Sequence, residues 1–258
     1  MLSSYAKREW LTIIAIGAML TVTFCIVGQW LLAVLALLAT LAVLSFFRDP
    51  ERRIPTQRGA FVSPADGRVS SVHEVEHFEP FDGPAVCIRI FLSVLNVHVN
   101  RSPCHGVVKS ITHRPGKHLN ALNPESAEVN EATLMVLAHP FQGHPIAAVR
   151  QVAGMLARTI VNAARVDQTL QRGQRFGIIK LGSTTELYLP KAHQPQVVVN
   201  VGERVYAGTT VLANVHPPRP GKLPRSGEAE SESESLHAGD SAAGDHADAD
   251  TAGAARAG

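Results

Sequence analysis

The stretch VCIRIFLSVLNVHV, residues 86–99, decides the fold class of the soluble part of this chain. It is rich in β-branched residues, and its apolar and polar positions partly alternate, which predicts a β-strand. Six further segments have the same character and are bounded by turn residues: 67–75, 107–112, 134–138, 176–181, 186–189 and 197–201. Residues 146–164 fit either a strand or a helix. We therefore predict an α+β fold that is mainly β, with a compact sandwich-like or barrel-like domain over residues 59–216.

Two short patterns recur within this predicted domain. The pattern S-P-x-x-G-x-V-x-S occurs at 63–71 and again at 102–110, and the glycine turn of 170–176 has a counterpart in 205–211. Each echo combines a turn, a glycine and the start of a strand. The repetition predicts a sheet structure with pseudo-twofold character.

The N-terminal region carries no charged residue from position 11 to position 47. A membrane-spanning helix needs about 20 apolar residues, so this run suits two helices, with Gly28 and Gln29 as the turn. One long tilted helix and a shallow re-entrant hairpin are the alternatives. Lys7 and Arg8 precede the run and arginines follow it, which predicts that both ends lie in the cytoplasm. Residues 1–58 are thus predicted to be a membrane anchor and a basic linker.

The composition of the remaining chain restricts its partners. Residues 217–258 are Pro-rich and then acidic and of low complexity, so we predict a disordered tail there. The rest of the chain is strongly basic, which suits anionic lipid head groups. Aromatic residues are few and no basic helix is evident, which argues against a nucleic-acid partner. His73 and His77 lie four apart in a predicted strand, too far apart to share an ion, so no metal site is predicted.

The dipeptide Gly182-Ser183 follows the strand-like run FGIIK. Glycine lacks a Cβ and gives the backbone freedom to adopt a strained conformation at this bond. The hydroxyl of Ser183 can then attack the carbonyl of Gly182 and replace the amide by an ester. Elimination across the serine releases the upstream chain and leaves dehydroalanine, which hydrolyses to a pyruvoyl group and ammonia. Taken alone, such a dipeptide is more often a turn at the end of a strand.

The run FGIIKLGSTTELYLP, residues 176–190, resembles the self-cleavage segment of phosphatidylserine decarboxylases. Three more segments resemble the short-chain class of the same family: SPADGRV (63–69), FLSVLNVHVNRSPCHG (91–106) and the span 154–180. The stretch PGKHLNA (115–121) and the pair Asn130-Glu131 are also similar. The resemblance covers about residues 45–216, and in kind the apolar N-terminal region, but not the acidic tail.

This resemblance implies a self-cleaving proenzyme. Ser183 would become the pyruvoyl N-terminus of an α chain, residues 183–258, and residues 1–182 would form the β chain that stays with it. The covalent pyruvoyl group is the one cofactor implied, because its ketone forms a Schiff base with the amino group of phosphatidylserine and holds the electrons as carbon dioxide leaves. The product is phosphatidylethanolamine, so the resemblance implies a role in phospholipid biosynthesis. The catalytic domain is expected on the cytoplasmic side of the cell membrane.

The resemblance also implies roles for individual residues. Asp66 matches the family aspartate associated with activating self-cleavage, and His98 matches a histidine near the pyruvoyl group, where a proton carrier is useful. The longer class has a second histidine three residues further on, where this chain has Arg101. Either His98 serves both steps, or another group such as His105 or His144 takes the second role. Arg101 could instead bind the substrate carboxylate or phosphate, because its fork suits both.

Two functions of other classes remain open from the sequence. A membrane-tethered adaptor with a lipoyl-like β domain suits the glycine turns and the anchor, but the chain lacks long heptads and a lysine in a biotin-type turn. A pyruvoyl enzyme that acts on a soluble amino acid is the other, although such a substrate gives no reason for a membrane anchor. A homo-oligomer is compatible with either enzyme.

Overall fold

The computed structural model describes residues 1–119, 129–154, 159–180 and 183–215. Several predicted features lie outside the described residues. They are Gly182, the acidic tail 217–258, the end of the PGKHLNA stretch, and positions 155–158 of the segment that fits either a strand or a helix.

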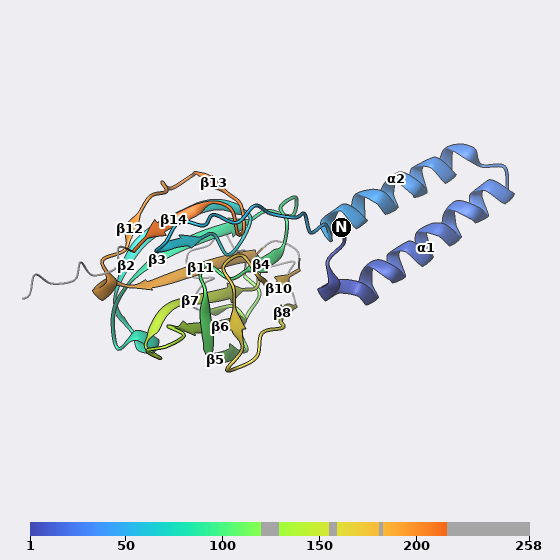
Figure 1. Cartoon of the computed structure of the whole chain (residues 1–258). Coiled ribbons are helices and arrows are strands. Elements are labelled where there is room, and N and C mark those ends of the chain that lie inside the picture. The colour runs from blue at the N-terminus through green and yellow to red at the C-terminus, as the bar shows by residue number, and fades with distance from the viewer. Residues whose placement is uncertain (120–128, 155–158, 181–182, 216–258) are drawn as a thin grey trace, which may run out of the picture. The chain divides into compact units, whose positions relative to one another are not determined.

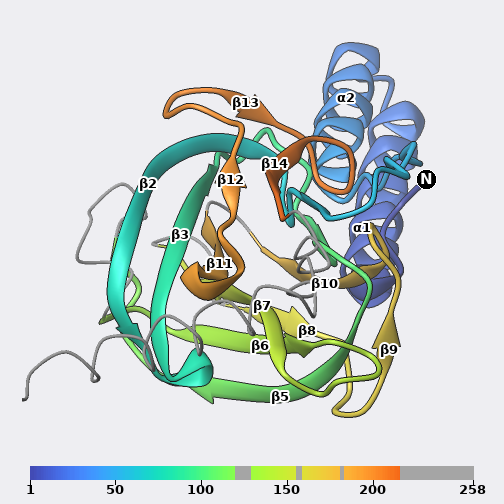
Figure 2. The same cartoon turned by 60° about the vertical axis from the view of Figure 1, so that its left-hand side comes forward.

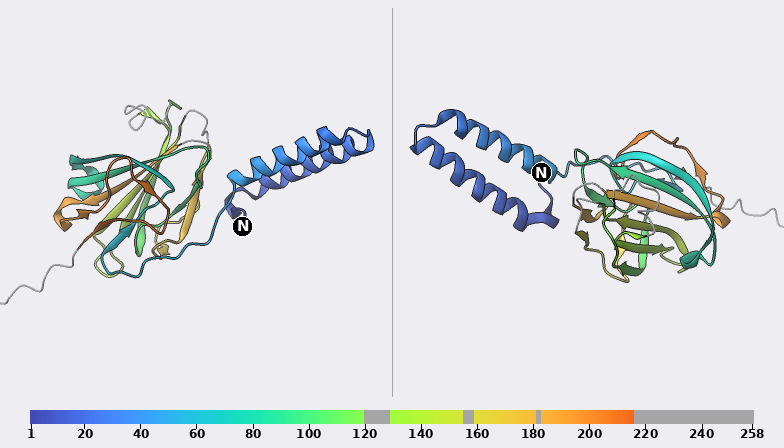
Figure 3. Two further views of the ribbon diagram at one scale, coloured as in Figure 1. Left: turned by 90° about the horizontal axis from the view of Figure 1, so that it is seen from above. Right: turned by 180° about the vertical axis from the view of Figure 1, so that it is seen from behind.

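The apolar N-terminal region forms a helical hairpin. Helix α1 (Lys7–Ile26) follows a single 3-10 turn and is joined to α2 (Trp30–Phe46) by the predicted turn. Gly28 there has φ +79°, a left-handed conformation that favours glycine. The two helices run antiparallel, side by side (Figure 1; Figure 3). The predicted hairpin is therefore confirmed.

Small residues let the two helices approach closely, and apolar residues cover their outer surface. At Gly17 an added Cβ would lie 2.2 Å from Thr40 Oγ1, so only glycine fits this contact. Many leucine, isoleucine and valine side chains of both helices are exposed. The helical stretch Ser4–Ile26 is long and apolar enough to cross a membrane, whereas α2 is shorter, with 17 residues.

Strands are the main regular structure in the rest of the described chain. Its strands are β1 (Ala60–Val62), β2 (Gly67–Phe78), β3 (Gly83–Leu92), β4 (Val99–Arg101), β5 (Gly106–Arg114), β6 (Ala132–Ala138), β7 (Pro145–Val152), β8 (Ile160–Asn162), β9 (Thr169–Leu170), β10 (Arg175–Ile179), β11 (Ser183–Pro190), β12 (Gln196–Val197), β13 (Arg204–Val205) and β14 (Val211–Asn214). Two 3-10 turns, Glu79–Phe81 and Lys191–His193, connect some of them.

The largest sheet consists of two similar halves. Its order is β13-β2-β3-β11-β7-β6-β5-β9, and its neighbouring strands are antiparallel. From the edges inward, both halves have a short edge strand, two long strands and then a central strand, β11 or β7. Figure 2 shows this sheet curling round into an open barrel. The two three-stranded sheets, β1-β14-β12 and β4-β10-β8, correspond to each other in the same way as these two halves. The predicted mainly β fold with pseudo-twofold character is confirmed.

The two S-P-x-x-G echoes occupy equivalent places in these halves. Ser63 donates its hydroxyl to the carbonyl of Ala65 at 2.6 Å, and Ser102 donates to that of Cys104 at 2.8 Å. The first turn leads into β2 and the second into β5. The two turns also exchange backbone hydrogen bonds. The two copies of the sequence repeat therefore correspond to each other in the pseudo-twofold arrangement.

The inner face of the curled sheet packs the main core. Buried apolar side chains from the long strands meet there: Val69, Ile88, Ile90, Leu92, Val108, Met135, Leu137, Val149, Leu187 and Leu189. On β11, strand alternation puts Ser183 and Thr185 on the same side as Leu187 and Leu189. The N-terminal half of β11 is thus a polar patch at the end of an apolar core.

The outer face of the same strand buries a charged cluster. Glu186 lies between Arg89 of β3 and Arg150 of β7, with N···O distances of 3.5 and 3.1 Å. The hydroxyl of Tyr188 donates to the same carboxylate at 2.7 Å. Glu186 is only 2% exposed, and its two oxygens are paired with neighbouring groups.

Two predicted strands differ from the structure. The stretch 86–99 is not one strand, because it breaks into β3 and β4 at a turn in which the Asn96 side chain accepts from the backbone and hydroxyl of Ser93. The predicted strand 197–201 ends at Val197, because the chain turns at Asn200–Glu203 with Gly202 at φ +89°. Both errors have the same cause: a short turn that local side chains close within an apolar run.

Candidate active site

Ser183 is the first residue of β11, three residues before the start predicted from the sequence. It pairs with Leu92 of β3 and is completely buried. Its Oγ has no hydrogen-bond partner within the described part of the chain. A buried hydroxyl without a partner costs about 1–3 kcal/mol, so most buried hydroxyls are hydrogen-bonded.

A chain of buried amides runs away from this end of β11. Asn100 donates to Thr185 Oγ1 and to the carbonyl of Pro64, both at 3.2 Å. Gln151 donates to Asn100 Oδ1 at 2.9 Å, and Asn162 donates to Gln151 Oε1 at 3.3 Å. Our reading of the sequence missed these residues. Asn100 directly follows the predicted strand 86–99, and Gln151 and Asn162 lie in the stretch 146–164, which fits either a strand or a helix, so no pattern in the sequence linked them.

His98 is completely buried in the segment between β3 and β4. Its carbonyl accepts from the N–H of Ile179 at 3.2 Å, which places it beside the end of β10. Its Nδ1 lies 2.8 Å from the carbonyl oxygen of Asn96. Because a carbonyl only accepts, Nδ1 carries the proton and the neutral ring keeps its lone pair on Nε2.

The surroundings of His98 favour the neutral ring. The ring of Phe46, the last residue of α2, lies 4.3 Å away between centroids. Burial lowers the pKa of His98 to about 4; the hydrogen bond to Asn96 opposes this shift, and the charge of Arg48 adds to it. At neutral pH the side chain is therefore a proton acceptor.

Asp66 is buried at the start of β2, and both of its carboxylate oxygens are occupied. Oδ1 accepts from the N–H of Ala207 at 2.8 Å, and Oδ2 accepts from Arg52 at 2.7 Å. Burial raises the pKa of Asp66, although the hydrogen bond from Ala207 and the charge of Arg52 oppose the rise. Neither His98 nor Ser183 is among its partners in the described residues.

Sheet register still brings Asp66 near the serine. Arg68 of β2 pairs with Phe91 of β3, and Phe91 pairs with Thr184 of β11. Two strand spacings amount to about 10 Å. Asp66 and Ser183 therefore belong to one region of the sheet without touching.

Arg101 is buried on β4 and contacts the linker that follows α2. Its guanidinium donates to Asp49 at 2.8 Å, to the carbonyl of Pro50 at 3.0 Å and to that of Gly173 at 3.1 Å. These contacts hold the linker on the domain. Substrate binding by Arg101 stays a prediction.

The other two candidate histidines lie at the far end of the sheet. His144 immediately precedes β7, and the opposite end of that strand, Val152, pairs with Thr184. Eight strand residues span about 26 Å. His105 immediately precedes β5, whose first residues pair with the same remote end of β6. Both side chains are exposed, so this geometry favours His98 as the histidine of the site.

An apolar cavity of about 590 Å³ lies next to this region. The helix ends, the loop after β3 and the end of β10 line it: Glu9, Ile13, Ala42, Val43, Ser45, Phe46, Phe47, Arg48, Val94, Leu95 and Lys180. Lys180 stands three residues before Ser183 and forms an ion pair with Glu9. The cavity thus combines apolar walls with two cationic side chains, Lys180 and Arg48.

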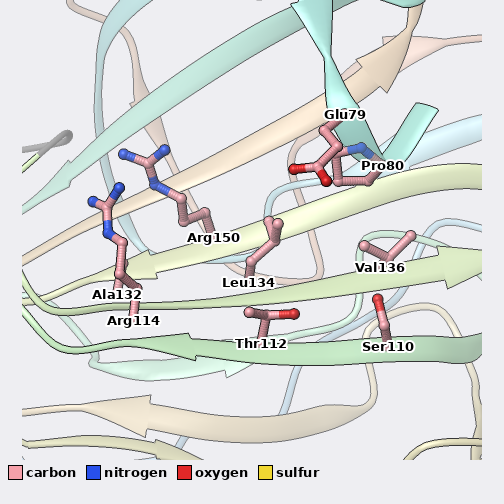
Figure 4. Close-up of a pocket in the computed structure, with 9 residues that line it drawn as sticks. All are labelled: Glu79, Pro80, Ser110, Thr112, Arg114, Ala132, Leu134, Val136 and Arg150. Carbon is pink, nitrogen blue, oxygen red and sulfur yellow. The ribbon is translucent and has the colours of Figure 1, made fainter. Parts of the chain in front are cut away.

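A second pocket, of about 490 Å³, lies on the outer face of the sheet. Figure 4 shows Arg114 and Arg150 at one end of it and Glu79 and Pro80 at another. None of the site residues predicted from the sequence lines it. It is separated from Ser183 by the sheet itself, because Arg150 and Ser183 lie on opposite faces.

Fold and site define this chain as an enzyme with a mainly β catalytic domain and an apolar helical hairpin. The family described as phosphatidylserine decarboxylase matches residues 39–213. The "Phosphatidylserine decarboxylase proenzyme" of Rhodopirellula baltica is 48% identical over 184 residues, which cover 71% of this chain and 76% of that protein. The proteins of the same name from Nitratidesulfovibrio vulgaris and Symbiobacterium thermophilum are 44% and 46% identical over 81% of this chain and 94% and 95% of theirs.

The chain belongs to the phosphatidylserine decarboxylase family. The match spans the β domain and the end of the apolar region, so the resemblance found in the sequence motifs is confirmed. The adaptor alternative is excluded by this membership, because the relatives are decarboxylases by name.

Proposed function

We propose that this chain cuts itself between Gly182 and Ser183 and then decarboxylates phosphatidylserine with the pyruvoyl group that the cleavage leaves. The single observation that carries the proposal is the buried Oγ of Ser183, which has no hydrogen-bond partner in the described residues. A hydroxyl held this way is not stabilised in its ground state and is available to attack the preceding carbonyl. The carbon atoms of a pyruvoyl group come from a serine, so the residue at position 183 fits this cofactor.

In the cleavage step, the Ser183 Oγ–H proton must move to a base while the Oγ–C bond forms and the C–N bond of Gly182-Ser183 breaks. His98 is the candidate acceptor, because its buried ring is neutral and its Nδ1–H is fixed on Asn96. Asp66 is proposed to support the same step from about 10 Å away, through its charge. The proton passes on to the nitrogen of Ser183, which becomes a free amine. Elimination then removes the Cα proton and breaks the Cβ–Oγ bond, so that the upstream chain leaves with a Gly182 carboxylate and dehydroalanine remains. Water hydrolyses the imine tautomer of dehydroalanine, which supplies the ketone oxygen and releases ammonia.

A pyruvoyl group at position 183 would supply an electrophilic ketone for the substrate amine and an electron sink for the loss of carbon dioxide. The residues around it bind and orient the lipid. Lys180 and Arg48 are placed to face an anionic phosphate, and the apolar walls beside them suit the upper part of the acyl chains. Burial of Ser183 keeps water from the reacting carbons.

The helical hairpin is proposed to hold the domain at the membrane that contains its substrate. One helix is long and apolar enough to span, and basic residues flank both ends of the hairpin. This pattern favours a cytoplasmic position for the catalytic domain.

Intact mass spectrometry of the purified full chain tests the proposal. We expect two chains that divide at Gly182–Ser183, with the smaller one blocked by a pyruvoyl group. The same preparation should release carbon dioxide from phosphatidylserine in vesicles and not from free serine or other amino acids. A single uncut chain that is active would refute the mechanism, and activity on a soluble amino acid would indicate the other pyruvoyl enzyme.

A further inference from the structure

The linker between the helical hairpin and the β domain lies on the domain and is held there by ion pairs. Asp49 accepts from Arg101 at 2.8 Å and from Arg175 at 2.5 Å. Further along, Arg172 donates to the carbonyls of Pro55 and Gln57 at 2.8 and 2.7 Å. These contacts fix the linker on both sides of its central residues, 51–54.

Arg52, in that central part, reaches into the domain. Its Nη2 lies 2.7 Å from Oδ2 of Asp66, and the two side chains are 15% and 6% exposed. Its guanidinium carbon also lies 5.6 Å from the centroid of the Tyr206 ring. Asp66 is thus enclosed between the linker and the loop after β13, where Ala207 donates to its other oxygen.

The charges that face Asp66 come from two parts of the chain. Arg52 belongs to the linker and Arg48 to the end of the helical hairpin, while the loop after β13 contributes the N–H of Ala207 and the Tyr206 ring. Burial raises the pKa of Asp66; the hydrogen bond from Ala207 and the charges of Arg52 and Arg48 oppose the rise, and of these two arginines Arg52 is the one that hydrogen-bonds to Asp66. Without Arg52, a buried carboxylate would keep a single backbone donor, and protonation would become easier.

We propose that Arg52 is a positioning residue for self-cleavage, through which the juxtamembrane linker keeps Asp66 oriented and ionised. The maturation site then includes a residue from outside the β domain. This inference rests on the proposed function, in which Asp66 supports the attack by Ser183. It assigns the linker a part in maturation in addition to its part as a tether.

The sign of the expected pH effect follows from the carboxyl group. Cleavage needs Asp66 as a carboxylate, so its rate falls as the pH drops through the pKa of Asp66. Removal of a neighbouring arginine raises a carboxyl pKa by about 1–3 units. The acid side of the cleavage profile should therefore move to higher pH by about the same amount when Arg52 loses its charge.

The test follows self-cleavage of the newly synthesised full chain, in the presence of phospholipid vesicles, in buffers of increasing pH. Arg52→Met removes the charge and keeps the apolar stem, Arg52→Lys restores a charge, and Arg53→Met is the matched control because Arg53 is exposed. Gel separation of cut and uncut chains gives the rate. We expect Arg52→Met to cleave slowly at low pH and to recover at high pH, with Arg52→Lys close to the unaltered chain and Arg53→Met identical to it.

Recovery of cleavage at high pH also shows that the variant is folded. Arg52→Gln, which keeps one amide donor, provides a second uncharged variant and should show the same displaced profile. An unshifted profile in both uncharged variants would overturn the inference, as would an equal loss at every pH that Arg52→Lys does not restore. Ser183→Ala separates the two proposals: if it is still cut, the proposed function fails, whereas an uncut Ser183→Ala with an unshifted Arg52 series refutes only the role of the linker.

Discussion

The two faces of β11 bury polar groups in opposite ways. On the outer face, Glu186 is paired with two arginines and a tyrosine hydroxyl. On the inner face, three residues earlier, Ser183 is equally buried and its hydroxyl has no partner in the described chain. The comparison teaches that burial alone does not mark a reactive residue. A buried group with partners stabilises the fold, whereas a buried group without them costs free energy.

The largest expected effect is on the inner face. Ser183→Ala should abolish self-cleavage and decarboxylation completely, because the attacking oxygen is gone. The unfolding midpoint of the uncut chain should stay the same or rise, because the variant no longer buries an unpaired hydroxyl. Electrophoresis, a carbon dioxide assay and thermal unfolding in detergent measure these three results.

Ser110→Ala is the matched control, since Ser110 is a strand serine that lines the pocket on the outer face. It should cleave and decarboxylate normally. A clear loss of stability in Ser183→Ala would contradict the contrast between the two faces, because it would mean that the hydroxyl is well partnered.

The next effect is on the outer face. Glu186→Ala, made in the uncut Ser183→Ala chain, should lower the free energy of unfolding by about 3–5 kcal/mol, because it removes a buried carboxylate that is paired with two largely buried arginines. Urea unfolding followed by circular dichroism measures the change. Lys191→Ala breaks the exposed ion pair with Glu74 and should cost less than about 1 kcal/mol. Equal losses of unfolding free energy in Glu186→Ala and Lys191→Ala would contradict the claim that the buried charged cluster stabilises the fold.

A third test uses the pH dependence of stability. The pKa of His98 is about 4 in the folded chain, below its ordinary value of 6.5. Between these values the unfolded chain binds a proton that the folded chain does not. Stability is therefore fully present above the ordinary value and falls as the pH drops toward 4, by up to about 1.4 kcal/mol per pH unit.

Replacement of His98 by Gln, again in the uncut chain, should remove this part of the acid sensitivity. Unfolding free energies at several pH values give the slope for both proteins. An unchanged slope would show that the ring is not buried in its neutral form, and would remove the argument that it acts as a proton acceptor.

A smaller effect than those of Glu186 and His98 is expected for the amides near Ser183. Gln151→Leu leaves Asn100 Oδ1 without its donor and should cost about 1–3 kcal/mol. In a double-mutant cycle, Asn100→Leu combined with Gln151→Leu should cost less than the sum of the single changes, because the partners form one chain. Additive costs would show that the inner face is not a connected polar network.

The sequence predicted the elements of this molecule better than their boundaries. Apolar alternation located most of the strands, and the uncharged run 11–47 located the hairpin. The break between β3 and β4 was missed, because it depends on the Asn96 side chain bonding back to Ser93. Such local hydrogen bonds leave no trace in hydrophobic periodicity.

The sequence named the candidate site residues, whose roles stay predictions, and it did not predict their contacts. Ser183, His98, Asp66 and Arg101 all prove to be buried, which four charged or polar residues seldom are. Their partners come from segments far away in the chain, such as the linker for Asp66 and Arg101. Spacing along the chain contains no information about such contacts.

The sequence by itself determined the family, the apolar hairpin, the mainly β domain and the serine at which cleavage is proposed, because these depend on local composition and short motifs. Only the tertiary structure decided that Ser183 Oγ has no partner within the described residues while Glu186 has three, and that the linker meets Asp66. Sheet register and the course of the linker set both outcomes, since they bring together strands and segments that the chain order keeps apart.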